Sequence, residues 1–506
     1  MTNWVLAIDA GTTGVRCRAV FADDRPSVAS YREFTQHFPR PGWVEHDTDE
    51  IWAAVVETFG ELLARIADDG TSDRLPVAIG ITNQRETVVA WDRRTGRAFG
   101  RAIVWQDRRT ADFCRRLETD GHLPVVRRTT GLVLDPYFSG SKMRWILDER
   151  FAGSPPADLA LGTVDSWLIW KLTAGRVFVT DVSNASRTML LDITTRAWSD
   201  ELSDLIGVPL RHLPEVGPSS GRLGVTACDE LPSGIPVSGV AGDQQAALFG
   251  QACFEPGATK NTYGTGSFVL MNVGPTCPPP VDGLLTTIAW TIGDGSSART
   301  AYAYEGAIFV TGAAIQWLRD GLGIIASASE IGPLAESAVD NGGLFVVPAF
   351  TGLGSPWWDP WARGTIVGIT RGTTRSHLAR AVVESMALQV RDAVDAMSGA
   401  SGVAVTDLRV DGGASVMDLL LSLQADQLGI VVRRPVDQET TALGAALLAG
   451  LAEGVWPDLA GVAARWRQES EFHPSADRAT ADALHRDWLR AVERSRSWAE
   501  GADDAS

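Results

Sequence analysis

Short apolar runs recur along this chain, and three of them lead to an aspartate at a turn that contains glycine or threonine. The first run, Val5–Ile8, ends at Asp9, and a Gly-Thr-Thr-Gly turn separates it from a second strand-like run, Arg16–Phe21. Two such runs joined by a short turn are typical of a β-hairpin rather than of a strand that leads into a helix. The other two runs are Val237–Val240 and Leu408–Val410.

These later runs lead to Asp243 and Asp411, and a further hairpin-like segment between them contains Tyr263-Gly264-Thr265-Gly266-Ser267. Turns rich in glycine and threonine present backbone N–H groups and hydroxyls that can hold phosphate oxygens. Each turn alone is weak support, because most such clusters only reverse the chain. Their recurrence after apolar strands predicts that two domains bring them together in one cleft.

Helical and strand-like segments alternate along the chain. Residues 51–67 and 416–428 have helical spacing of apolar side chains, and residues 77–81 have the pattern of a buried strand. Alternation of this kind favours α/β layers. Since 506 residues exceed one ordinary core, we predict an α/β chain of two domains, residues 1–251 and 252–506.

Composition excludes several classes of protein. A hydrophobic share of 45% is ordinary for a globular chain, and a net charge of -17 argues against a nucleic-acid partner. Five widely spaced cysteines form no CxxC pair, which fits a reducing compartment. The first residues are not basic and include Asp9, so we expect no signal peptide, no membrane insertion and a cytoplasmic protein.

Competing phosphate and hydrolase motifs are missing from the sequence. It contains no GxxxxGK[ST] and no GxGxxG after a strand, which argues against a P-loop enzyme, a Rossmann dehydrogenase and a protein kinase. Residues 217–221 match GxSxG, but no clear helix follows them. We therefore predict a loop there, not the nucleophile elbow of a hydrolase.

Long blocks of the sequence resemble one known family. The chain is similar to the FGGY carbohydrate kinases from about residue 5 to 456, and most of all to those that phosphorylate glycerol. The blocks include Pro41-Gly42-Trp43-Val44-Glu45-His46-Asp47, Gly80-Ile81-Thr82-Asn83-Gln84-Arg85-Glu86-Thr87, Asp135-Pro136-Tyr137-Phe138-Ser139-Gly140, Asn184-Ala185-Ser186-Arg187-Thr188-Met189 and Gly242-Asp243-Gln244-Gln245-Ala246-Ala247-Leu248-Phe249-Gly250.

The resemblance implies a two-domain actin-like ATPase (ribonuclease H-like) fold with a catalytic cleft between the domains. It also implies transfer of the γ-phosphate of ATP to glycerol, with Mg²⁺, and assembly as a homodimer or homotetramer. Asp243 is then the general base, and Asp9 lies with Asp243 on the side of the metal. From the sequence alone, Asp243 serves equally well as a helix cap, and Asp9 as a turn-forming residue.

The resemblance also assigns binding positions. Those for the nucleotide are Thr12, Thr13, Arg16, Thr265, Gly266, Gly312, Gln316, Gly412, Gly413 and Met417, and those for glycerol are Arg85, Glu86, Trp105, Tyr137, Asp243, Gln244 and Phe268. Without the resemblance, Arg16 is an exposed strand arginine and Gly312 a packing glycine. Trp105 and Phe268 would then be core aromatics, and Arg85–Glu86 a solvated pair.

Three positions depart from the family pattern. Met417 stands where an asparagine near adenine is usual, and Gly14 stands where serine is common. Residues 227–234 match a loop that binds fructose 1,6-bisphosphate in some members, but here the loop has two acids and no basic residue. We therefore expect no inhibition by this bisphosphate.

Two alternatives to glycerol phosphorylation stay open at this point. One is an FGGY kinase for another small polyol or a ketose. The other is a non-catalytic, actin-like ATP-binding regulator, which would need neither a general base nor a polyol pocket.

Overall fold

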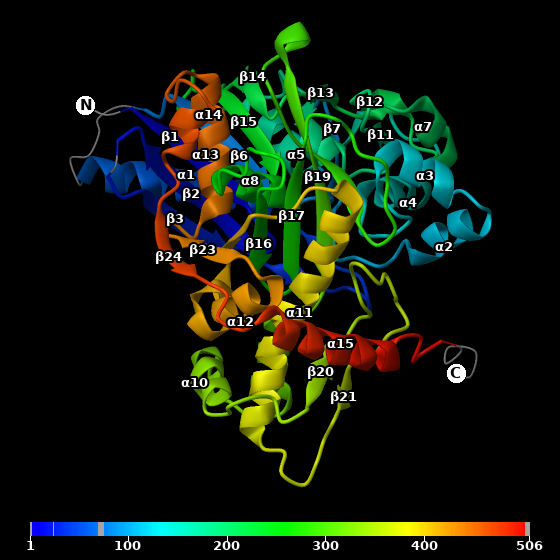
Figure 1. Cartoon of the computed structure of the whole chain (residues 1–506). Coiled ribbons are helices and arrows are strands. Elements are labelled where there is room, and N and C mark those ends of the chain that lie inside the picture. Colours follow the sequence, from blue (N-terminus) through cyan, green and yellow to red (C-terminus); the bar gives the residue numbers. More distant parts are fainter. Residues whose placement is uncertain (1–2, 24, 69–74, 501–506) are drawn as a thin grey trace.

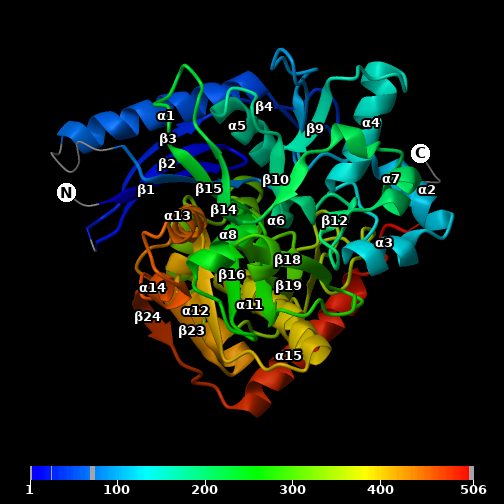
Figure 2. The ribbon, with the colours of Figure 1, turned by 90° about the horizontal axis from the view of Figure 1, so that it is seen from above.

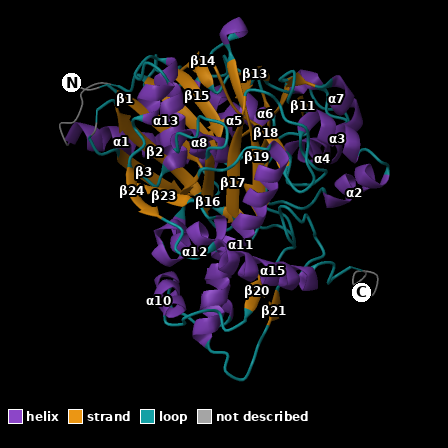
Figure 3. Cartoon of the chain, in the orientation of Figure 1, coloured by secondary structure: helices purple, strands orange, loops and turns teal. Residues whose placement is uncertain are grey.

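A thirteen-stranded mixed sheet runs through the molecule (Figure 3). The computed structural model describes residues 3–23, 25–68 and 75–500. In the order of the sheet, the strands are β24 (Gln468–Phe472), β23 (Val431–Pro435), β22 (Asp407–Asp411), β16 (Thr259–Tyr263), β17 (Ser267–Gly274), β19 (Arg299–Ile308), β18 (Leu285–Ile292), β14 (Ser220–Val225), β15 (Pro236–Gly242), β6 (Ala78–Asn83), β1 (Trp4–Ala10), β2 (Gly14–Phe21) and β3 (Val28–Glu33).

The first half of the sheet contains the predicted amino-terminal hairpin. β1 and β2 pair in antiparallel fashion, with Asp9 opposite Arg16, and β3 continues the antiparallel set. β6 pairs in parallel with β1, and β15 pairs in parallel with β6. The hairpin and the strands predicted at 77–81 and 237–240 are therefore confirmed.

The second half of the sheet repeats this order of strands. β16 and β17 form an antiparallel hairpin, β19 continues it, and β22 and β23 follow in parallel on the other side of β16. The halves join where Ser220 of β14 pairs with Ile292 of β18. β24 was not predicted, because a strand reading Gln-Glu-Ser-Glu-Phe at the edge of a sheet lacks an apolar run.

Two helices interlock the halves (Figures 1 and 2). α8 (Asp243–Gly250) follows the first half's β15 but contacts β16, β17 and β18 of the second half. α13 (Thr440–Ala452) follows the second half's β23 but packs on β1, β6 and β15. The two helices also pack against each other in one apolar cluster. This exchange places the start of α8 between the halves.

Each half has its own helical cover and core. α1 (Thr48–Asp68) packs on β2 and β3, while α11 (Arg375–Ser401) packs on β17 and β19 and contacts α12 (Asp418–Leu428). The helix predictions at 51–67 and 416–428 are confirmed, although a 3₁₀ turn occupies 413–416 before α12 begins. Residues 217–221 join two strands without a helix, as predicted.

Smaller elements surround this frame. α2, α3, α4 and α7 gather on one side of the first half (Figures 1 and 2), near a five-stranded sheet ordered β4-β5-β8-β7-β9. Their bounds are β4 (Gln36–His37), β5 (Glu45–His46), β7 (Val88–Asp92), β8 (Ala102–Ile103), α2 (Ala111–Thr119), α3 (Leu123–Thr130), α4 (Ser139–Phe151), β9 (Leu159–Thr163), α5 (Val164–Leu172), β10 (Val179–Asp181), α6 (Val182–Ala185), β11 (Leu191–Asp192), β12 (Ala197–Trp198), α7 (Asp200–Ile206) and β13 (Glu215–Gly217).

The carboxyl-terminal segment packs on the second half. Its helix α15 (Arg478–Ser495) buries Trp488 against an apolar cluster shared with α11 and β20. The remaining elements there are α9 (Gly312–Gln316), α10 (Ile331–Glu336), β20 (Phe345–Val347), β21 (Thr365–Val367) and α14 (Leu459–Ala463). Residues 468–506 have the pattern of a polar-faced helix followed by an acidic tail, and the end of that tail lies outside the described residues. Over the described ranges, no helix combines the length and apolar character that crossing a bilayer requires.

Candidate functional site

Residues from both halves meet at the start of α8. Asp243 is the first residue of α8, and its Oδ1 lies 3.2 Å from Nε of Arg85, which follows β6. The Asp243 side chain is 32% exposed, so it faces open space rather than a sealed interior. Its Oδ1 also accepts a hydrogen bond of 2.8 Å from the backbone N–H of Gln244. The same carboxylate thus accepts one N–H of the first turn of α8, whose N-cap is Gly242, and remains available to a ligand.

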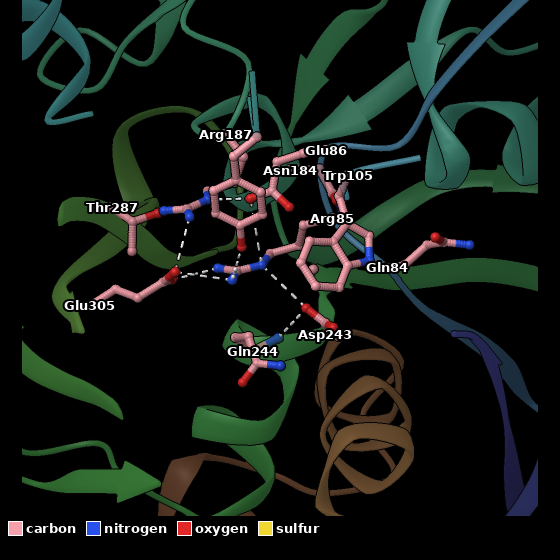
Figure 4. A network of polar contacts seen from close by, with 12 residues as sticks. Gln84, Arg85, Glu86, Trp105, Asn184, Arg187, Asp243, Gln244, Thr287 and Glu305 are labelled. Carbon is pink, nitrogen blue, oxygen red and sulfur yellow. Dashed lines mark hydrogen bonds and ion pairs between the residues drawn. The ribbon is translucent and has the colours of Figure 1, made fainter. Parts of the chain in front are cut away.

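A ring of buried charges lies beside Asp243 (Figure 4). Arg85 donates two hydrogen bonds to Glu305 of β19, at 2.5 and 3.1 Å. Arg187 donates to the same Glu305 at 2.9 Å and to Glu86 at 2.7 Å. All four side chains are at most 2% exposed, so Arg85 and Glu86 are not the solvated pair that the residues alone would favour without the resemblance. Glu305 connects the second half of the sheet to the site.

The ring sets the protonation of its own members. Burial alone would raise the pKa of Glu305, but Arg187 and Arg85 hold that pKa at about 2. Burial raises the pKa of Glu86, although both guanidinium groups oppose the shift. Glu86 also has a φ of 60°, a strained value for a residue other than glycine. Among the described residues, Nη1 of Arg187 is buried without a hydrogen-bond partner.

Aromatic side chains form walls around the ring. The hydroxyl of Tyr137 accepts a hydrogen bond of 3.1 Å from Arg85, and the Tyr137 ring packs edge-on against Trp105 with centroids 5.7 Å apart. The Phe268 ring lies under the Arg85 guanidinium at 5.8 Å. Trp105 and Phe268 are partly exposed at the border of apolar clusters. They therefore pack as core aromatics on one side and stay open on the other.

Gln244 is held from the second half of the sheet. Its Oε1 accepts a hydrogen bond of 2.5 Å from Nζ of Lys260 in β16, which also donates to Thr262 at 2.9 Å. Lys260 is fully buried, and burial lowers its pKa to about 8 against the attraction of Asp411 and Asp243. This contact fixes the orientation of the Gln244 amide.

The first glycine–threonine turn lies next to this region. Oγ1 of Thr12 accepts a hydrogen bond of 3.0 Å from Nε1 of Trp105, and Thr13 hydrogen-bonds the Tyr31 hydroxyl at 3.2 Å. Arg16 forms an ion pair with Glu439, just before α13. Arg16 is thus not a free surface arginine, because it also lies over the Tyr31 ring at 5.5 Å in its own half.

The second set of turns comes together within the second half. Backbone carbonyls of Gly264 and Thr265 accept hydrogen bonds from residues 311–313, which brings Thr265, Gly266 and Gly312 together. A Cβ at position 312 would lie only 2.6 Å from the Gly264 carbonyl oxygen. Glycine at this position is therefore also required for close backbone packing. Gln316 and Gly413 are exposed, and Met417 is partly exposed at the start of α12.

The carboxylates suit a magnesium ion that accompanies a nucleotide. Burial raises the pKa of Asp9 to about 7, Arg16 opposes the shift, and Asp243 and Glu439 add to it. A cation nearby would relieve this repulsion between carboxylates. Of the described residues, no three His, Cys, Asp or Glu form a metal-binding group. Mg²⁺ is typically bound by one or two carboxylates, waters and phosphates, so this donor set fits it.

Sequence reasoning missed three charged residues of the site, namely Arg187, Glu305 and Lys260. Arg187 lies in a block that carries the family resemblance, but its contacts to Glu86 and Glu305 bridge residues distant in sequence. Glu305 interrupts the largely apolar strand β19, and Lys260 lies in the mostly polar strand β16; both positions prove fully buried. A charged residue in the middle of a buried strand is the signal that could have found them, because such residues need partners.

Comparison with known proteins agrees with this arrangement. Residues 4–250 match the model of the amino-terminal domain of the FGGY family of carbohydrate kinases, and residues 259–453 match the model of its carboxyl-terminal domain. A glycerol kinase of Bordetella parapertussis is 51% identical over 505 residues, 99% of this chain and 98% of that relative. Glycerol kinase 2 of Thermotoga maritima is 52% identical over 501 residues, 98% and 99% of the two chains.

Solved structures share the whole fold. The structure of Plasmodium falciparum glycerol kinase with ADP superposes with a TM-score of 0.92 at 32% identity and covers 98% of both chains. A gluconate kinase of Lactobacillus acidophilus reaches a TM-score of 0.87 at 20% identity over 100% of both chains, a likeness in fold. The fold is that of the two-domain actin-like kinases. The chain belongs to the FGGY family of carbohydrate kinases.

Proposed function

We propose that this protein transfers the γ-phosphate of ATP to a terminal hydroxyl of glycerol, giving sn-glycerol 3-phosphate and ADP. The observation that carries the proposal is the pairing of Asp243 with Arg85 beside the Trp105–Tyr137 wall. The full-length relatives at 51–52% identity named glycerol kinase support the same activity. A partly open carboxylate, a fixed guanidinium and two rings suit a small triol that must be oriented before it reacts.

In this proposal Asp243 is the general base. Phosphoryl transfer needs little covalent help, but the attacking hydroxyl must be oriented and must give up its proton. Asp243 would take that proton while Arg85 keeps the carboxylate in place. Arg85, Glu86, Tyr137 and Gln244 would hydrogen-bond the glycerol hydroxyls. Trp105 and Phe268 would pack against its carbon chain.

The turns of both halves would hold the nucleotide. Thr12, Thr13 and Arg16 would contact its phosphates from the first half, and Thr265 and Gly266 from the second. The nucleoside would lie along Gly312, Gln316, Gly412, Gly413 and Met417. Mg²⁺ would neutralise phosphate charge, held through water by Asp9 and Asp243. Arg16 would exchange Glu439 for phosphate, which offers a stronger charge-assisted contact.

A coupled ATP assay tests the proposal. ADP release should be fastest per active site with glycerol when it is compared with xylulose, ribulose, erythritol and dihydroxyacetone. A preference for a ketose would favour another FGGY activity. ADP release that does not depend on any polyol, or no release at all, would favour a non-catalytic ATP-binding regulator.

Three further assignments belong to the proposal. The domain boundary lies between residues 251 and 252, where limited proteolysis under destabilising conditions should release the two parts. The protein assembles as a homodimer or homotetramer, which sedimentation velocity can distinguish from a monomer. A cytoplasmic location fits both a requirement for ATP and five cysteines that are all free thiols.

A further inference from the structure

Glu305 occupies an unusual place in the ring of buried charges. It lies on β19 in the second half, whereas Arg85, Glu86 and Arg187 belong to the first half. Its two oxygens accept three hydrogen bonds, from Arg85 at 2.5 and 3.1 Å and from Arg187 at 2.9 Å. No proposed glycerol contact uses Glu305. The hydrogen bonds that Glu305 accepts in the site therefore come from the two guanidinium groups.

The ring is balanced in charge because of Glu305. Arg85 and Arg187 contribute two positive charges, and Glu86 and Glu305 contribute two negative charges. Around the ring, Asp243 and Lys260 add one charge of each sign. The Glu305 carboxyl stays ionised at neutral pH, because both guanidinium groups hold its pKa at about 2. Without it, two arginines would leave a net positive charge in a buried site.

Such a balance discriminates between substrates by charge. Glycerol is neutral and can donate and accept hydrogen bonds without changing the sum of charges. Glycerate also has three carbons, but a carboxylate replaces one terminal CH2OH group. In this site that carboxylate would be an extra, uncompensated negative charge, and burying an unpaired charge is strongly unfavourable.

We infer that Glu305 is a specificity-determining residue, which neutralises the guanidinium groups of the polyol site so that the site binds a neutral triol and rejects acidic three-carbon compounds. The inference rests on the proposed function. It assigns Glu305 an electrostatic task in addition to positioning Arg85, and it predicts that removing one negative charge from the ring creates a place for an anion.

The test compares glycerate binding to the wild-type protein and to Glu305→Gln. Glutamine keeps the size of the side chain but removes its charge. D-glycerate should bind Glu305→Gln at least about tenfold more tightly, because a unit charge at short range in a protein changes binding by this order or more. Glycerol should bind more weakly, since Arg85 loses its bidentate partner. Inhibition competitive with glycerol and calorimetry with glycerate alone provide two readouts at pH 8.

Control variants separate charge from packing. Glu305→Asp keeps the charge and should gain no glycerate affinity, although glycerol binding weakens. The double variant Glu305→Gln/Arg187→Gln restores the charge balance of the ring, so its affinity for glycerate should return to that of the wild type. Glu453→Gln removes a carboxylate that pairs with Arg222 outside the site, and it should leave glycerate affinity unchanged. If Glu305→Gln does not fold, Glu86→Gln removes a ring carboxylate by a second route and should show the same gain.

The outcomes are distinct. Tighter glycerate binding in Glu305→Gln, reversed in the double variant, supports the inference. Unchanged or weaker glycerate binding in a folded Glu305→Gln, or in Glu86→Gln where that variant replaces it, overturns it. A wild-type protein that does not phosphorylate glycerol would instead overturn the proposed function.

Discussion

The polyol side and the nucleotide side of the proposed site differ in how far their side chains are already held in place by the protein. On the polyol side, Arg85, Glu86 and Glu305 are at most 2% exposed, and Arg85 pairs with Glu305 at 2.5 Å and with Glu86 at 3.8 Å. On the nucleotide side, Thr265 and Gly413 are exposed, and the surface there is built largely of turns. The polyol side is preorganised by side chains that hold one another, whereas the nucleotide side offers open backbone.

This difference fits the two ligands. A triol has few atoms, so the affinity and orientation that it can gain depend on groups already fixed in place. A nucleotide is large and carries several phosphate charges, which backbone N–H groups and a metal ion can hold without dedicated side chains. Substitutions on the polyol side should therefore affect specificity and stability together, whereas substitutions at exposed nucleotide-side positions with room for a side chain should affect binding of ATP alone.

The largest effect is expected at Asp243, where the two sides meet. Asp243→Asn should lower the turnover number at least about 10²-fold, the usual scale for loss of a general base. Folding and glycerol binding should largely persist, because an asparagine can still accept from the Gln244 N–H and from Arg85. Steady-state kinetics together with glycerol calorimetry check this. An unchanged turnover number would remove Asp243 from the mechanism.

The next effect concerns the acid stability of the polyol side. A carboxyl whose pKa falls from 4.5 to about 2 on folding stabilises the protein above pH 4.5, and this contribution is lost as the pH falls towards 2. For Glu305 the contribution is on the order of 3 kcal/mol. The unfolding temperature of wild type should therefore fall more steeply between pH 4.5 and 3 than that of Glu305→Gln. Parallel curves would contradict the low pKa of Glu305.

A matched pair of glycines tests the nucleotide side. Gly412 has a φ of 85°, and a Cβ there would lie 2.5 Å from the Tyr263 carbonyl oxygen, so Gly412→Ala should destabilise the fold by about 1–3 kcal/mol. At Gly413 a Cβ would meet no described atom within 4 Å. Gly413→Ala should keep the unfolding temperature and raise the KM for ATP about tenfold, while the KM for glycerol stays constant. An unchanged KM for ATP would show that the nucleoside does not bind against Gly413.

The smallest effect is expected from fructose 1,6-bisphosphate. Residues 227–234 carry Asp229 and Glu230 and no basic residue, and Glu230 accepts a hydrogen bond of 3.3 Å from Trp52. Two acidic side chains in this loop repel an anion, so low-millimolar bisphosphate should leave activity unchanged. An inhibition curve in this concentration range would reveal an anion site elsewhere on the protein.

The sequence predicted the hairpins and the strands at 77–81, 237–240 and 408–410 because each is a local pattern. The run before Asp9, the glycine–threonine turn and the run after it suffice to indicate β1 and β2. The edge strand β24 was not predicted because its residues are mostly polar, and an edge strand needs few apolar contacts.

For the site, sequence and family resemblance predicted the residues around Asp243 but not the charged residues that hold them in place. Arg187 and Glu305 are 118 residues apart, and only the packing of β19 beside the first half brings them together. Likewise, nothing local indicates that Lys260 holds Gln244. Long-range partners of buried charges depend on how the halves interlock, which no short segment of sequence encodes.

A crystal structure with glycerol and a non-hydrolysable ATP analogue tests the central claim most directly. We expect a terminal oxygen of glycerol within about 2.6–3.2 Å of the Asp243 carboxylate, in line with the γ-phosphate, and the polyol held against Arg85 and Trp105. A glycerol molecule bound away from Asp243, or a γ-phosphate that cannot align with its hydroxyl, would contradict the account.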